Sequence, residues 1–77
     1  MNYLVIEIQT TGNVTAHIAT AYDNQPQAES KFHQILAAAA TSNVEVHSAV
    51  VLNEFGAIVQ QGYYDHREPV VEEQPNE

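Results

Sequence analysis

Hydrophobic residues recur with the 3.6-residue period of a helix in one stretch, residues 26–41. The apolar positions i, i+4, i+7, i+8 and i+11 of this stretch are Ala28, Phe32, Ile35, Leu36 and Ala39. Asp23 and Asn24 are suitable N-caps ahead of Pro26. Ser42-Asn43 follows the last periodic residue, and asparagine tolerates the left-handed conformation that ends many helices. The pattern therefore predicts a single helix that ends at these two residues.

Apolar and polar residues alternate on both sides of this helix, as in half-buried strands. The alternation predicts strands over residues 3–10, 14–22, 44–53 and 57–64. Thr11-Gly12-Asn13 joins the first two strands. Asn53-Glu54-Phe55-Gly56 joins the last two, as a type I turn with Gly56 in the left-handed region. This second turn predicts the cross-strand pairs Leu52–Ile58, Val51–Val59 and His47–Tyr63.

The first hairpin admits two registers. A two-residue Gly12-Asn13 turn places His17 opposite Ile8, inside the core of the predicted fold. A three-residue loop with Asn13 left-handed places His17 opposite Glu7 instead. Burying an unpaired histidine is costly, so we favour the three-residue loop.

The element order predicts an α+β fold, ββαββ, with a four-stranded antiparallel sheet and one helix packed on one face. A crossover that skips one strand gives the spatial order 2-1-3-4. This domain covers residues 1–64, and residues 65–77 form an acidic tail that we expect to be disordered. The residues expected beneath the helix are Leu4, Ile6, Ile8, Ile18, Val46, Val50 and Leu52.

The other sheet face then stays uncovered, although about half of its residues are apolar. A contiguous apolar patch of this kind usually marks an interface. The chain has 77 residues and no cysteine, so neither a large core nor disulfides stabilise it, and oligomerisation is the remaining common route. We therefore expect a homodimer through the uncovered face, with the interface residues Tyr3, Val5, Ala19, Ala49, Val51, Val59 and Tyr63.

Charge and composition exclude several classes of partner. The formal net charge of −8 argues against nucleic acid and anionic lipid, and about half of that charge lies in the tail. No apolar run approaches the roughly 20 residues of a membrane span. Residues 1–8 lack the basic region and cleavage site of a signal peptide. We expect a cytoplasmic protein with neither nucleic acid nor a membrane among its partners.

Four titratable residues are expected on the uncovered face: Glu7, His17, Glu45 and His47. Imidazoles and carboxylates are zinc-type ligands, but each histidine stands alone on its strand, without the close spacing of metalloenzyme motifs. A cross-strand polar pair between Glu7 and His17, with His47 stacked near Tyr63, explains them more simply than a metal site does. A metal-dependent activity using His17 and His47 is therefore the least favoured hypothesis. We expect no enzymatic activity, no catalytic residue, no bound metal and no cofactor.

Three stretches carry a resemblance to a known group of proteins. They are residues 3–9 (YLVIEIQ), residues 28–40 (AESKFHQILAAAA) and residues 44–52, centred on VHSAV. Together they resemble a family of small, uncharacterised proteins encoded by phages and prophages of gut Firmicutes. The resemblance covers about residues 1–66 and is one of whole-chain pattern. It implies a phage setting in a bacterial host and a small accessory or assembly role, and it transfers no active-site residues.

The favoured function is that of a small, non-enzymatic accessory protein of the phage or prophage type. It would act by protein–protein interaction as a homodimer, with a host protein as a further possible partner. The alternative belongs to another class: an acidic inhibitor that occupies the basic site of a host nucleic-acid enzyme by imitating phosphate charge. That alternative requires clustered carboxylates on the folded surface, and the concentration of acidity in the tail counts against it.

Overall fold

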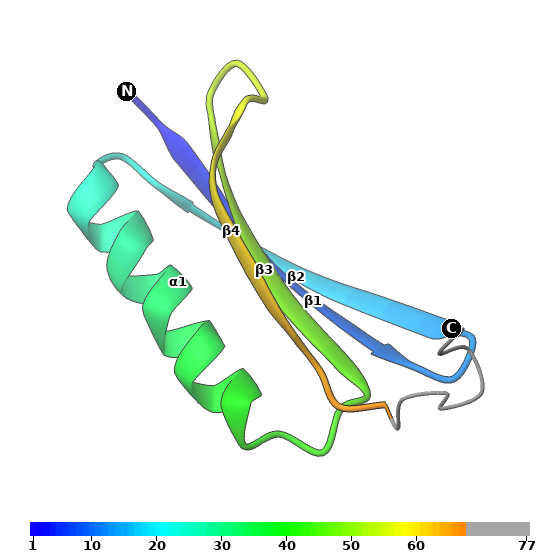
Figure 1. Cartoon of the computed structure of the whole chain (residues 1–77). Coiled ribbons are helices and arrows are strands. Elements are labelled where there is room, and N and C mark those ends of the chain that lie inside the picture. Colours follow the sequence, from blue (N-terminus) through cyan, green and yellow to red (C-terminus); the bar gives the residue numbers. More distant parts are fainter. Residues whose placement is uncertain (68–77) are drawn as a thin grey trace, which may run out of the picture.

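The computed structural model describes residues 1–67 and consists of one four-stranded antiparallel sheet with a single helix on one face (Figure 1). The elements follow in the order β1 (Tyr3–Thr11), β2 (Val14–Tyr22), α1 (Gln25–Ala40), β3 (Val46–Asn53) and β4 (Ile58–Asp65). In space the strands are ordered β2-β1-β3-β4. The predicted fold class, element order and strand order are confirmed.

The helix forms where its period and its cap predict it. The side-chain oxygen of Asn24, the N-cap, accepts a hydrogen bond of 2.9 Å from the backbone N–H of Gln27. The buried residues of the helix are Ala28, Phe32, Ile35 and Ala39, all from the predicted stripe. The helix ends at Ala40, and the N–H of the C-cap residue, Thr41, donates to the carbonyl of Ala38 at 3.3 Å. The left-handed stop predicted at Asn43 is wrong, because among residues 1–67 only Gly12 and Gly56 have positive φ.

The β1–β2 hairpin uses the two-residue turn, and the favoured three-residue loop is wrong. Ile8 pairs with His17, and Thr11 pairs with Val14 across the turn. The positive φ falls on Gly12, at 62°, which is the glycine position of a type II′ turn. This register leaves His17 exposed, because the Ile8 face of the sheet is the one that the helix does not cover. Because His17 is exposed in this register, the two-residue turn does not carry the free-energy cost of burying a histidine.

A bulge changes the pairing of the second hairpin. Leu52 pairs with Ile58 as predicted, but Val51 pairs with Gln60 and His47 pairs with Tyr64. The register shifts between Val51 and Leu52, so Val59 is the extra residue on β4. The predicted pairs Val51–Val59 and His47–Tyr63 are therefore wrong. The turn itself matches the prediction, with Gly56 at φ 83°.

The helix covers the opposite face of the sheet from the one predicted. The core consists of Val5, Ala28, Phe32, Ile35, Ala49 and Val51, with Tyr3, Tyr22 and Leu36 packed around it. The strand residues beneath the helix include the small Ala49 and Gly62, and a β-carbon at Gly62 would lie only 2.8 Å from Leu36 Cδ1. Small residues let the helix approach the sheet closely on this side. The bulkier Leu4, Ile6, Ile8, Val50 and Leu52 consequently face away from it.

The end of β4 is fastened to the helix. The backbone N–H of His66 donates to the carbonyl of Glu45 at 2.7 Å. The Nε2–H of the His66 ring donates to the carbonyl of Ala39 at 2.8 Å, in the last turn of α1. Residues 65–67, assigned to the tail from sequence, therefore belong to the fold. The rest of the predicted tail, residues 68–77, lies outside the described residues.

Candidate functional site

The residues predicted to form an interface lie mostly beneath the helix. Val5, Ala49 and Val51 are fully buried there, and Tyr3 is half-buried with its hydroxyl 3.5 Å from Gln25 Oε1. This part of the prediction is wrong, because both sheet faces alternate equally well and the face was chosen incorrectly. Of the other predicted residues, Ala19 and Tyr63 do face away from the helix. Val59 is the bulge residue.

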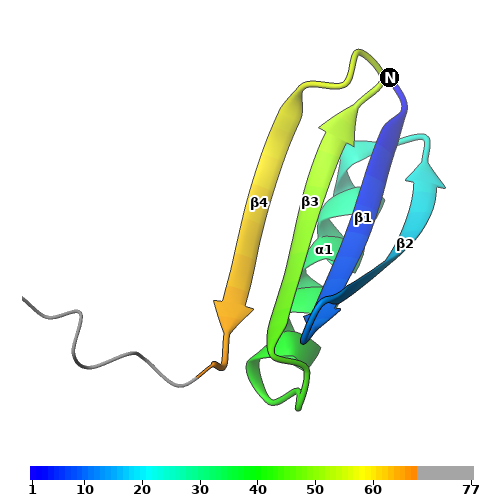
Figure 2. The same ribbon diagram turned by 90° about the vertical axis from the view of Figure 1, so that its right-hand side faces the viewer.

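The face that no described element covers is called here the open face, and Figure 2 looks onto it with α1 behind the strands. Directly paired residues point to the same side of a sheet, so the strand pairs identify its members. They are Leu4, Ile6, Ile8 and Thr10 on β1, Thr15, His17, Ala19 and Ala21 on β2, Val46, Ser48, Val50 and Leu52 on β3, and Ile58, Gln61, Tyr63 and Asp65 on β4.

The open face is predominantly apolar at its centre. Ile6 on β1 lies between Ala19 on β2 and Val50 on β3, and Leu4 and Leu52 pair beside them. Neighbouring strands shield the sides of Leu4, Ile6, Val50 and Leu52 and leave them half-buried, whereas Ala19 and Tyr63, on the outer strands, are exposed. An uncovered face of an antiparallel sheet normally carries polar residues. This continuous aliphatic surface is therefore the candidate interaction site of the molecule.

Charge is almost absent from the open face. Asp65 is the only charged residue on it among the strand residues that the structure describes, and it lies at the end of β4. Its carboxylate is held by Arg67 through Nε at 2.9 Å and through Nη2 at 2.7 Å. These hydrogen bonds lower the pKa of Asp65 to about 2. Apart from Asp65 at its margin, the open face thus has no charged residue, in a chain whose formal net charge is −8.

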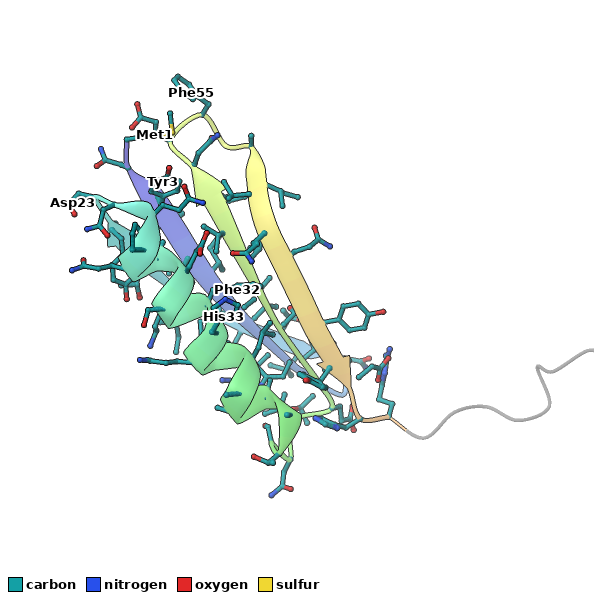
Figure 3. All side chains as sticks on the ribbon, turned by 60° about the vertical axis from the view of Figure 1, so that its left-hand side comes forward. Met1, Tyr3, Asp23, Phe32, His33 and Phe55 are labelled. Carbon is teal, nitrogen blue, oxygen red and sulfur yellow. The ribbon has the colours of Figure 1, made fainter. Side chains whose placement is uncertain are left out.

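A shallow hollow of about 360 Å³ lies over β3 and β4 on the open face. Its walls include Val50, Gln61 and Tyr63, and Gly62 contributes to its lining. The hollow could accept an aliphatic or aromatic side chain from a partner. At one end of the molecule Phe55, in the β3–β4 loop, and Met1 are both exposed, outside the strand pairs that make up the open face (Figure 3).

The titratable residues expected on the open face are separated by the structure. Glu7 and His47 lie on the helix side, where His47 Nε2 and Glu7 Oε2 are 2.6 Å apart. His17 lies on the open face, and Glu45 accepts a hydrogen bond of 2.9 Å from the backbone N–H of Gly12. No three histidine or acidic residues within residues 1–67 are placed to hold a metal ion. The predicted sharing of one face by these four residues is wrong, and His17 and His47 cannot act on one ligand.

The Glu7–His47 contact has the character of a structural hydrogen bond. His47 is 4% exposed, and its Nδ1 has no hydrogen-bond partner among the described residues. Burial raises the pKa of Glu7, but hydrogen bonds from His47 and Gln9 and the nearby charges of His47 and Lys31 lower it by more, so the net pKa lies below its usual value of 4.5. A buried imidazole that no substrate can reach is unsuited to catalysis. The pair ties β1 to β3 beneath the helix.

The carboxylates of the described residues do not gather on one surface. Glu7 is on β1, Glu29 on α1 and Asp65 on β4, while Asp23, Glu45 and Glu54 lie in connecting segments. Phosphate mimicry needs several carboxylates on one surface, so this distribution gives no support to the acidic-inhibitor hypothesis. No helix of the described chain is long and apolar enough to cross a membrane.

No protein-family model, curated protein or solved structure matches the chain. The open face is therefore the feature of the molecule that bears on function. Leu4, Ile6, Ile8, Val50 and Leu52, at its centre, were missed as interface residues because they were placed in the core. The sequence did carry a signal against that placement: Ala49 and Gly62 share the opposite face, where only small residues allow a helix to lie close.

Proposed function

We propose that the protein is a small, non-enzymatic accessory protein that acts by protein–protein interaction and forms a homodimer through its open face. The phage or prophage setting implied by its sequence resemblance is part of this proposal. The observation that carries it is the aliphatic, uncharged sheet surface left without cover by residues 1–67. In the dimer two such surfaces pack against each other, with one helix on each outer side.

The size of the open face is adequate for a weak dimer. Strands of eight or nine residues at about 3.3 Å per residue are about 26–30 Å long, and four strands about 4.8 Å apart span about 19 Å. The face therefore measures about 500 Å² in plan, or about 1,000 Å² for two copies, near the lower limit for a specific interface. The expected dimer dissociates on dilution.

Because the core is small, association would add substantially to the stability of the fold. Only one aromatic residue, Phe32, is fully buried among the described residues, and a domain of this length is marginally stable alone. Covering Ile6, Val50 and Leu52 would remove further apolar surface from water at about 25 cal/mol per Å². Folding and dimerisation are therefore expected to support each other.

The distribution of charge supports a second copy of the chain as the partner. A second copy carries the same negative charge, which opposes association unless the contacting surfaces are free of carboxylates. The open face meets that condition, because Asp65 lies at its margin and is paired with Arg67. A nucleic acid or an anionic membrane would require basic residues that the face does not contain.

The test is the molecular mass by light scattering over a concentration series, for the wild type and for Ile6→Glu. Ile6 is at the centre of the open face, so a glutamate there buries an unpaired charge in the dimer but points to water in the monomer. At high concentration we expect the wild type to have a mass of at least two copies and the variant to be a folded monomer. Phe55→Glu changes an exposed loop residue and is the matched control, which should keep the wild-type mass. A monomeric wild type, or an Ile6→Glu variant with unchanged mass, would overturn the proposal.

A further inference from the structure

The outer edge of β2 is a second surface that the open face does not explain. β2 is a nine-residue strand at the border of the sheet, and its first six residues are all exposed. On the helix side of the strand, Val14 is 70% exposed and Ile18 is 59% exposed. Figure 2 shows α1 behind β3 and β1, with β2 beyond it at the border. The helix thus leaves these two aliphatic residues uncovered on its own side of the sheet.

This edge lacks the features that normally protect a border strand. Natural edge strands carry charged residues, proline or a bulge that prevents pairing with another chain. β2 contains no charged residue and no proline, and its nine pairs with β1 run without a register shift. β4, at the other border, has a bulge at Val59 and ends in the charged Asp65. Only the β2 edge is open to pairing along its whole length.

We propose that β2 pairs antiparallel with β2 of a second copy, across a two-fold axis perpendicular to the sheet, so that two sheets join into one of eight strands. Pairing of all nine residues puts the central residue, Ile18, opposite its own symmetry mate. Val14 then lies opposite Tyr22, and His17 lies opposite Ala19. No like charges meet in this register, because the strand has none.

The hydrogen-bond pattern of the hairpin agrees with this register. In a two-residue hairpin the pair that closes the turn, here Thr11 and Val14, is a hydrogen-bonded pair. Bonded and non-bonded pairs alternate from there, so Ile18, opposite Glu7, bonds inward to β1. The N–H and carbonyl groups of His17 and Ala19 consequently point outward. In the proposed pairing they bond to each other across the axis. The two Ile18 residues form a non-hydrogen-bonded pair, the arrangement in which side chains lie closest.

The area of the edge decides how the two interfaces combine. A strand about 30 Å long and about 10 Å thick offers about 300 Å² per copy, or about 600 Å² for the pair. This is below the range of stable isolated interfaces, which bury about 1,200–2,000 Å². The edge contact therefore forms between dimers already joined through their open faces, where two edge contacts act together. The expected assembly is a tetramer in which one two-fold axis relates the open faces and a second, perpendicular two-fold axis relates the β2 edges. This inference rests on the proposed function.

The experiment combines mass measurement with amide hydrogen exchange followed by NMR. At high concentration we expect the wild type to have the mass of four copies, Ile18→Lys that of two and Ile6→Glu that of one. The side chain of Ile18 is exposed in the monomer, so lysine is compatible with folding, and Val14→Lys provides a second edge variant. Phe55→Lys is the matched control and should retain the wild-type mass. The amides of His17 and Ala19 should exchange at least about tenfold more slowly in the wild type than in Ile18→Lys.

The two proposals fail in different ways. The edge contact is refuted if the wild type never exceeds two copies and the His17 and Ala19 amides exchange freely. It is also refuted if both lysine variants leave mass and exchange unchanged. A wild type of two copies that Ile18→Lys dissociates and Ile6→Glu does not would establish the edge contact and refute dimerisation through the open face.

Discussion

Replacing Gly62 with alanine tests which side of the sheet the helix covers. An added β-carbon would lie 2.8 Å from Leu36 Cδ1 and 3.6 Å from Phe32 Cζ. Carbon atoms normally approach no closer than about 3.5–4.0 Å, so Leu36 must shift or the helix must move away from β4. A sheet with the helix on its other face would have open space at this position.

The expected effect is a loss of stability of about 0.5–1.5 kcal/mol. Overpacking a core costs about 1–3 kcal/mol, and the lower part of that range applies because Leu36 is a half-buried, flexible side chain. Gly62 does not have positive φ, so alanine fits its backbone conformation. Alanine also restricts the unfolded chain, and this stabilises the protein by about 0.4–1 kcal/mol and offsets part of the cost of the clash. For a domain of this size, 1 kcal/mol corresponds to about 4–8 °C in Tm.

A double-mutant cycle with Leu36→Ala isolates the contact. In the Leu36→Ala background the clash is absent, so Gly62→Ala should be neutral or stabilising. Urea denaturation followed by circular dichroism, at one fixed protein concentration, measures the four free energies of unfolding. Gln61→Ala, which changes the neighbouring residue on the open face, is the control. If Gly62→Ala has the same effect in both backgrounds, the helix does not lie against Gly62 and our assignment of the open face fails.

Two further predictions concern the N-cap of the helix, Asn24, and the Glu7–His47 contact beneath the helix. Asn24→Ala removes the acceptor of the Gln27 N–H and should destabilise the protein by about 1 kcal/mol in urea denaturation, whereas Asn24→Asp should retain most of the stability. Glu7→Gln should flatten the pH dependence of stability. The folded-state pKa of Glu7 lies below 4.5, so its contribution is present above pH 4.5 and is lost as the pH falls through the folded pKa. Wild type and Glu7→Gln should therefore converge in stability as the pH is lowered, and a constant difference from pH 7 to pH 3 would contradict this.

The local patterns were sufficient to predict the elements. The stripe from Ala28 to Ala39 gave the helix, and alternation with glycine turns gave the strands to within two residues at each end. The strand order followed from a general preference for crossovers between strands that are not adjacent. These features depend on short-range geometry, which a sequence encodes directly.

The choice of face depends on information that alternation does not contain. On β1, Leu4, Ile6 and Ile8 make one apolar side, and Tyr3 and Val5 contribute to the other. The error in the first hairpin came from the same source, because His17 was kept away from Ile8 only on the assumption that Ile8 is buried. One decision, the side on which the helix packs, therefore determined both the hairpin register and the predicted interface.

The distribution of charge links the two proposed contacts. The chain has ten acidic residues, and tolerates them in loops, on the helix and beneath it, yet β2 has none and the open face has only Asp65 at its margin. A monomer would gain solubility from carboxylates on both surfaces, and an edge strand gains protection from them. Copies that associate through these surfaces would instead bury each added carboxylate next to its symmetry mate, which is strongly unfavourable. The absence of charge from the open face and from β2 is therefore what self-association requires of a chain as acidic as this one.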